Sequence, residues 1–211
     1  MALPKSPLKG IIAACRPEYD NCPASLEYIQ QNPTIKGLRR VLHVVPDELS
    51  QTSIFRNNIK RLTGTGLTFD LCVSSRQIPL TNSIVDYCPD VTFILDHCGV
   101  PDIKSGEFKD WSVRIVELAK RNNVFCKISG VIAYGDPEKW TLDDIRPYFE
   151  HVVSTFGHKR IVWGSDSPVC NLGGNLETWV AATRALSSEW NLRDKESLFW
   201  RNARQIWNIN I

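Results

Sequence analysis

Short apolar runs rich in β-branched residues recur along the chain and are separated by polar segments. A continuous apolar run of this length is typical of a strand buried on both faces, as in a parallel sheet covered by helices. We therefore predict six strands, at residues 8–14, 35–42, 67–73, 91–97, 124–129 and 161–166.

The segments between these runs show the three-to-four-residue spacing of amphipathic helices. Thr141 and Asp144 have the spacing of a capping box, and Gly157 stands where a helix would end. The helices are predicted at residues 25–31, 53–62, 80–87, 110–121, 142–156, 176–187 and 195–207.

Strand and helix alternate every 25 to 35 residues or so, which is the βαβ rhythm of an α/β fold with parallel strands. An open doubly wound sheet and a (β/α)₈ TIM barrel both fit this rhythm. The glycine-rich phosphate turn of a dinucleotide fold is missing, because Gly64 and Gly66 precede a strand instead of opening a helix. Polar residues gather at the strand ends, where a barrel carries its catalytic groups, so we favour the barrel.

Composition narrows the class of partner. With 43% hydrophobic and 23% charged residues among 211, the chain can form one domain, residues 1–211, with a sizeable core. The 25 basic and 23 acidic residues are mixed along the chain, which argues against nucleic acid and anionic membrane and favours a small-molecule substrate. No apolar stretch reaches the roughly 18 residues of a membrane span, and the start lacks a secretory signal, so we expect a cytoplasmic protein.

The chain has seven cysteines, an odd number, and no two of them form a Cys-x-x-Cys pair. This scatter is typical of reduced structural thiols and not of a disulfide framework or a zinc cage.

Asp166 and His97 are the candidate catalytic residues. Each ends an apolar strand, and a titratable group is uncommon there unless it has a partner or a function. Asp166 can equally cap a helix or pair with an arginine, and His97 can be a structural histidine. Two such groups at strand ends together favour function. Because side chains alternate along a strand, Asp96 and His97 should face opposite ways; we expect His97 to face the barrel mouth and Asp96 to orient a neighbour or pair outside it.

Other polar residues at the same strand ends are candidates for substrate binding. Arg39 and Arg40 are adjacent, so one of them can enter the rim and hold a carboxylate or an oxyanion, although a solvated pair is equally consistent. Lys127 can be a buried lysine paired with an acid such as Asp70 or Glu117. The full set of predicted binding residues is Arg39, Arg40, His43, Asp70 and Ser129.

Six segments carry a resemblance to a known family. They resemble, in order along nearly the whole chain, motifs of the amidohydrolase-related family, whose members include sugar-acid lactonases and pyrone dicarboxylate lactonases. The segments are GLRRVLH (37–43), FDL (69–71), LDHCGVPD (95–102), CKISG (126–130), WGSDSPVC (163–170) and NA (202–203).

The resemblance implies a (β/α)₈ barrel that hydrolyses the lactone of a small sugar acid or dicarboxylate. Asp166 matches the strand-eight aspartate that would orient or deprotonate the attacking water, and His97 matches a histidine that would bind a metal or polarise the carbonyl. Arg39 or Arg40 would hold polar groups of the substrate. A decarboxylase is the alternative within the same superfamily.

The family also opens with a first strand that carries a His-x-His metal-binding pair, and no such motif precedes Leu8. Counting back from Asp166, the first two of eight strands would be missing, so we expect an incomplete barrel that is part of a longer product or is completed by another chain, as in a homo-oligomer. His97 and Asp166 would then be the ligands of a zinc or manganese ion. Because catalytic zinc usually has three protein ligands, we expect little or no bound metal, and a catalytically impaired partial barrel is a further alternative.

Overall fold

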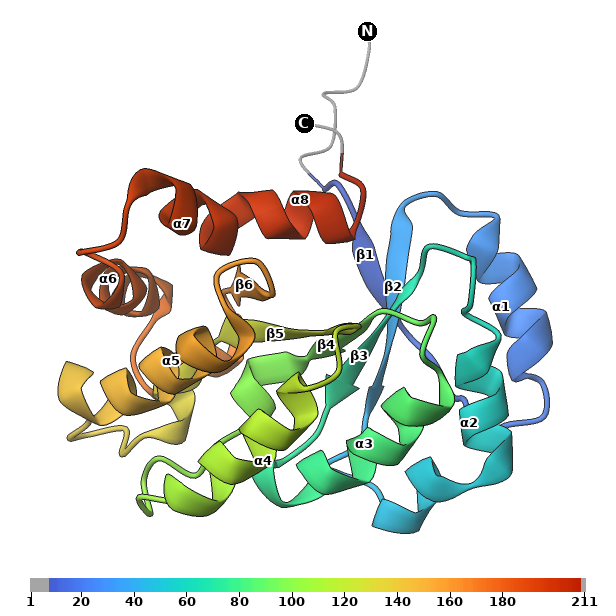
Figure 1. Cartoon of the computed structure of the whole chain (residues 1–211), viewed down its shortest axis with the longest axis horizontal. Helices are drawn as coiled ribbons and strands as arrows, with labels where there is room; N and C mark the ends of the chain where they lie inside the picture. Colours follow the sequence, from blue (N-terminus) through green and yellow to red (C-terminus); the bar gives the residue numbers. More distant parts are fainter. Residues whose placement is uncertain (1–7, 210–211) are drawn as a thin grey trace, which may run out of the picture.

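The computed structural model describes residues 8–209, in which six parallel strands form one curved sheet with helices on its outer side (Figure 1). The strands pair in sequence order, β1 with β2 and so on to β6. This is the α/β architecture of an incomplete TIM barrel, so the predicted fold class is confirmed. The strands are β1 (Ile11–Ala14), β2 (Ile35–Val41), β3 (Thr68–Cys72), β4 (Phe93–Leu95), β5 (Val124–Ser129) and β6 (Ile161–Gly164).

Helices connect successive strands and end close to where the sequence predicts. A π-helical turn, η6 (Ser197–Arg201), interrupts the last predicted helix, which is therefore not continuous. The helices are α1 (Cys22–Gln30), α2 (Ser53–Lys60), α3 (Ile78–Tyr87), α4 (Lys109–Ala119), α5 (Leu142–Phe156), α6 (Leu176–Leu186), α7 (Leu192–Glu196) and α8 (Asn202–Ile206).

Both ends of α5 follow from its sequence. The Thr141 side chain accepts from the backbone N–H three residues on, and the Asp144 carboxylate accepts from the backbone N–H and the hydroxyl of Thr141. These bonds satisfy donors that the first helical turn leaves free. Gly157 ends the helix with φ 72°, a left-handed value that glycine adopts without a Cβ penalty. The predicted capping box and stop are confirmed.

The sheet separates an apolar core from a polar interior. On the helix-facing side, fully buried residues such as Phe69, Phe93 and Ile128 pack beneath the helices. On the concave side, register places Arg39 beside Asp70, and two-residue alternation puts Lys127 and Ser129 on one face of β5. The strands therefore carry their charged side chains into the barrel interior.

Within residues 8–209, β1 and β6 each pair with a single strand and form the two edges of the sheet. The segment from α7 to α8 lies along β6 and runs across the open side towards β1 (Figure 1). No helix in this range combines the length and the apolar character that crossing a membrane requires. All seven cysteines are free thiols, as predicted.

Candidate active site

The structure brings His97 and Asp166 together at the carboxyl ends of their strands. His97 lies in the short helical turn η3 (Asp96–Gly99) that follows β4, and Asp166 lies two residues beyond β6. The Nδ1 atom of His97 is 3.2 Å from Oδ2 of Asp166, and the two side chains are only 10% and 11% exposed. The predicted convergence of an imidazole and a carboxylate at one mouth of the sheet is therefore observed.

Left-handed backbone conformations turn both residues into the site. His97 has φ 52° and Asp166 has φ 53°, values that non-glycine residues adopt uncommonly. Such conformations persist only where the surrounding structure enforces them, and they cluster at functional sites. The two strained positions support a functional role for this pair.

Residues from the end of β5 complete the surroundings of the pair. Ser129 Oγ is 2.8 Å from His97 Nδ1, and the Tyr134 hydroxyl donates to Asp166 Oδ2 over 3.4 Å. Gly130, with φ 58°, packs directly against Asp166; a Cβ there would overlap the Asp166 carboxylate and approach its Cγ to 2.8 Å. His97 Nδ1 and the Tyr134 hydroxyl both lie at Oδ2 of Asp166, and no side chain among residues 8–209 bonds to Oδ1, which leaves Oδ1 available to another partner.

Burial sets the protonation of both groups. Desolvation, with the positive charges of Lys127 and Arg39, lowers the pKa of His97 to about 3, so the imidazole is neutral near pH 7. Desolvation raises the pKa of Asp166 to about 6, against the opposing effect of the hydrogen bond from Tyr134. At neutral pH the site thus holds a neutral imidazole and a carboxylate of raised basicity.

Asp96 does not face away from the site, and this part of the sequence prediction is wrong. Its carboxylate is fully buried on the concave side, 2.8 Å from Arg39 Nε and 2.7 Å from Lys127 Nζ. The prediction assumed that strand alternation continues to His97, whereas β4 ends at Leu95 and the backbone turns at His97. Asp96 and His97 therefore point into the same space.

Four charged side chains form a network beneath the pair. Arg39 and Lys127 contact Asp70 as well as Asp96: Arg39 Nη2 lies 3.0 Å and Lys127 Nζ 2.7 Å from Asp70 Oδ2. Burial opposes the charge on Lys127, but the two carboxylates raise its pKa, so the ammonium is retained. Of the two acids predicted as partners of Lys127, the structure confirms Asp70, whereas Glu117 pairs with Lys120 and Arg121. Two cations and two carboxylates cancel, and the network carries no surplus charge.

Arg39 is the most accessible member of this network, since 32% of its side chain is exposed while Asp70 is fully buried. Asp70 therefore acts through Arg39 and Lys127 and has no exposed surface of its own. Arg40 points to the other face of β2, where its Nη2 lies 2.7 Å from Glu18 Oε1. The structure thus brings Arg39, and not Arg40, into the site.

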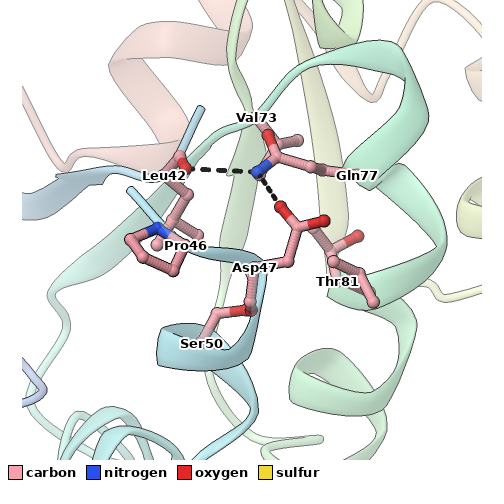
Figure 2. Close-up of a pocket in the computed structure, with 8 residues that line it drawn as sticks. Leu42, Pro46, Asp47, Ser50, Val73, Gln77 and Thr81 are labelled. Atoms are coloured by element: carbon pink, nitrogen blue, oxygen red, sulfur yellow. Dashed lines mark hydrogen bonds between the residues drawn. The ribbon is translucent and has the colours of Figure 1, made fainter. Parts of the chain in front are cut away.

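His43 lies at the margin of the site. Its Nδ1 is 3.7 Å from Cys72 Sγ at the end of β3. The loop that follows it is fixed by Gln77, whose Nε2 donates to the carbonyl of Leu42 and to Asp47 Oδ1 (Figure 2). The adjoining cavity holds about 10 Å³, room for a single water. This cavity is therefore too small for a substrate.

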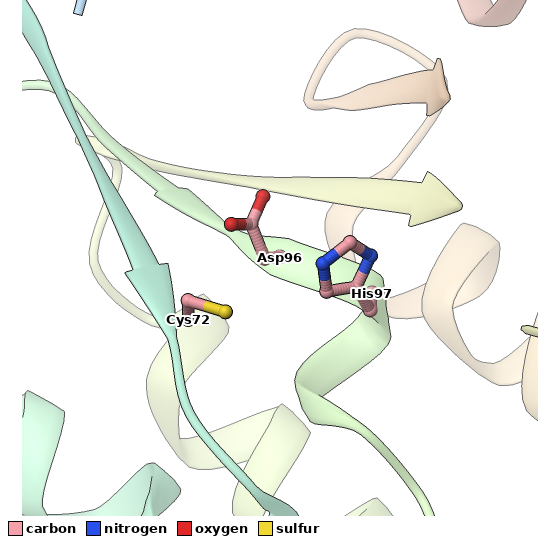
Figure 3. A group of neighbouring side chains, drawn as sticks. All are labelled: Cys72, Asp96 and His97. Atoms are coloured by element: carbon pink, nitrogen blue, oxygen red, sulfur yellow. The ribbon is translucent and has the colours of Figure 1, made fainter. Parts of the chain in front are cut away.

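Three possible metal ligands meet in the site: Cys72, Asp96 and His97 offer donor atoms within 4.8 Å of one another (Figure 3). This set shares His97 with the predicted metal pair but has Cys72 and Asp96 in place of Asp166. A neutral imidazole suits a metal. However, burial raises the pKa of Cys72 to about 12, and Asp96 is already paired with the cations Arg39 and Lys127. The donors are close enough, but their charge fits a divalent ion poorly.

Sequence reasoning did not identify Cys72, Gly130 or Tyr134 as parts of the site. Cys72 ends β3 on the same face as Asp70, so strand alternation was an available signal. Gly130 follows Ser129 directly and marks a left-handed turn. Tyr134 enters through the turn η4 (Val131–Tyr134), whose direction no local pattern indicates.

Comparison with known proteins identifies relatives along most of the chain. A family model described as amidohydrolase matches residues 3–209. An L-fucono-1,5-lactonase of Burkholderia ambifaria is 31% identical over 162 residues, which cover 76% of this chain and 56% of that protein. An L-rhamnono-gamma-lactonase of Scheffersomyces stipitis is 22% identical over 201 residues, covering 83% and 59%. The chain thus spans less than two thirds of the length of these two relatives.

Among solved structures, an amidohydrolase of Burkholderia multivorans with bound zinc superposes with a TM-score of 0.88 at 21% identity. The match covers 96% of this chain and 74% of that one. At this identity the likeness supports the barrel fold alone.

Proposed function

The chain belongs to the amidohydrolase family, and from this premise we propose that its site opens the ring of a lactone by adding water to the ester carbonyl. The observation that carries the proposal is the buried contact between His97 Nδ1 and Asp166 Oδ2 at 3.2 Å. The lactonase names of the two relatives support the type of reaction.

Asp166 is the general base in this proposal. Because His97 and Tyr134 contact Oδ2, Oδ1 can take a proton from the attacking water. A carboxylate with a pKa of about 6 is ionised at pH 7.5 yet more basic than an ordinary aspartate, which suits proton transfer near neutral pH. The water oxygen bonds to the carbonyl carbon, the bond from that carbon to the ring oxygen breaks, and Asp166 returns the proton to the leaving ring oxygen.

When water attacks, the carbonyl oxygen of the lactone gains negative charge and needs hydrogen-bond donors or a cation to stabilise it. Arg39 is partly exposed and remains charged, and it lies beside Asp96, which directly precedes His97. We assign to Arg39 the role of holding the lactone carbonyl, with His97 orienting the carboxylate of Asp166. Ser129 fixes the imidazole through its contact with Nδ1. None of these steps passes through a metal, because the charge of the possible ligands fits a divalent ion poorly; a bound zinc or manganese would supply Lewis acidity.

The balanced charge of the network favours an uncharged substrate. Arg39 and Lys127 are each bound to Asp70 and Asp96, which leaves no spare cation for the carboxylates of a dicarboxylate. The hydroxyl of Tyr134 and the imidazole of His43 suit a substrate rich in hydroxyls. We therefore propose a neutral sugar lactone, hydrolysed in the cytoplasm, in preference to a pyrone dicarboxylate.

The test measures ring opening on a panel of 1,5- and 1,4-sugar lactones and a pyrone dicarboxylate. A pH indicator monitors the acid that ring opening releases. We expect turnover of a sugar lactone and a loss of about 10²- to 10⁴-fold in kcat for Asp166→Asn. Retention of activity in that variant would refute the role of Asp166. Release of carbon dioxide from a carboxylated substrate would favour the decarboxylase alternative, and no turnover at all would favour an impaired barrel.

A further inference from the structure

The carboxyl-terminal segment reaches from one edge of the sheet into its interior. At its start, Asn202 Nδ2 donates to the carbonyl oxygens of His158 and Ile161, both at 2.7 Å, which attaches α8 to the beginning of β6. From there α8 runs across the open side of the sheet (Figure 1). The residue that follows α8 is Trp207, and its side chain contacts β3.

Trp207 binds β3, on the far side of the opening. Its Nε1–H donates to Thr68 Oγ1 over 3.0 Å, a contact between residues 139 positions apart. Thr68 is buried, and its hydroxyl occupies the space beside Gly37 on β2, where any Cβ would collide with it. The indole is therefore held by a buried partner and is not a loosely placed surface ring.

The same indole faces the charged network. Lys127 Nζ lies 5.8 Å from the centre of the Trp207 ring, within the range of a cation–π contact. Thr68 and Asp70 are two residues apart on β3 and share one face of the strand. Trp207, bound to Thr68, therefore lies one layer below the carboxylate that binds Lys127. The ring forms the floor of the site on the amino-terminal side of the strands.

We propose that Trp207 is a positioning residue of the site, which holds the Lys127 ammonium between Asp70 and Asp96 and so fixes the network that carries Arg39. Its effect on rate rests on the proposed lactonase function; its effect on Lys127 does not. The carboxyl-terminal segment is in this way part of the active site although it provides no group that touches substrate.

Four variants separate the contributions. Trp207→Leu removes both the ring and the N–H, Trp207→Phe keeps a ring face, and Thr68→Val removes only the hydrogen-bond acceptor. Trp200→Leu is the matched control, because Trp200 belongs to the same segment and is 38% exposed. Rates are compared at 25 °C on variants whose near-ultraviolet circular dichroism shows native packing.

The first readout is structural and needs no substrate. Proton NMR of the Lys127 ε-methylene group, assigned with Lys127→Arg, should show an upfield ring-current shift that Trp207→Phe keeps and Trp207→Leu loses. Thr68→Val should change the Trp207 indole N–H signal and leave the other indole signals in place. Unchanged Lys127 signals in Trp207→Leu would overturn the proposal.

The second readout is the rate. We expect kcat to fall about tenfold in Trp207→Leu with KM within about twofold, and to recover in Trp207→Phe. Equal kcat for Trp207→Leu and Trp200→Leu would also overturn the proposal. If the unchanged chain opens no lactone, the proposed function fails, and the NMR result still decides whether Trp207 positions Lys127.

Discussion

Gly130 offers a sharp test of how closely Asp166 is positioned. An alanine Cβ at this position would overlap the Asp166 carboxylate and lie 2.8 Å from its Cγ, so the carboxylate must move by about 0.5–1 Å. A displacement of this size can cost about 10²-fold in rate. We therefore expect Gly130→Ala to lower kcat/KM for lactone opening by about two orders of magnitude.

Gly157→Ala is the matched control for this change. Gly157 has φ 72°, similar to the 58° of Gly130, but nothing lies within 4 Å of the position where its Cβ would be. Both variants should lose about 1–3 kcal/mol of stability, seen as falls in Tm: Gly157→Ala because φ 72°, ψ 160° is a conformation that alanine rarely adopts, and Gly130→Ala because of its left-handed backbone and the overlap with Asp166. Only Gly130→Ala should lose activity. If its kcat/KM stays within about twofold of that of Gly157→Ala, the reasoning about Asp166 is wrong.

Three further outcomes follow from the same groups. Because Asp166 must be ionised to act as a base and its pKa is about 6, kcat/KM should rise with pH through about 6 and then level off; a profile flat between pH 5 and 8 would contradict this. Lys127→Met leaves Asp70 and Asp96 with one cation fewer and should cost about 3–5 kcal/mol in urea unfolding, whereas a loss under 1 kcal/mol would show that the network is weakly coupled. Treatment with EDTA should leave kcat unchanged, and restoration of activity by added zinc or manganese would show a functional metal.

The sequence predicted the six strands well because burial of both faces leaves an unmistakable apolar run. β5 was predicted at its observed bounds, and β4 was predicted two residues too long at each end. The ends of α5 were predictable since capping chemistry is local. The π-helical turn η6 was not, because a contiguous helical pattern carries no signal for one extra residue in a turn.

The site was predictable in its two central residues and less so in its surroundings. His97 and Asp166 follow strands directly, so the common direction of parallel strands brings them to one edge. The direction of Asp96 depends on a left-handed turn at His97, and histidine only mildly favours that conformation. The role of Trp207 depends on contact with Thr68, 139 positions away, which no local pattern encodes.

A double-variant cycle on kcat/KM tests most directly the claim that the imidazole and the carboxylate work as one unit. It compares His97→Gln, Asp166→Asn and the chain carrying both changes on the best lactone of the panel. Groups that act together lose little more in combination than the worse single change, and this is the result we predict. Losses that multiply would show that the two groups act independently and would contradict the account.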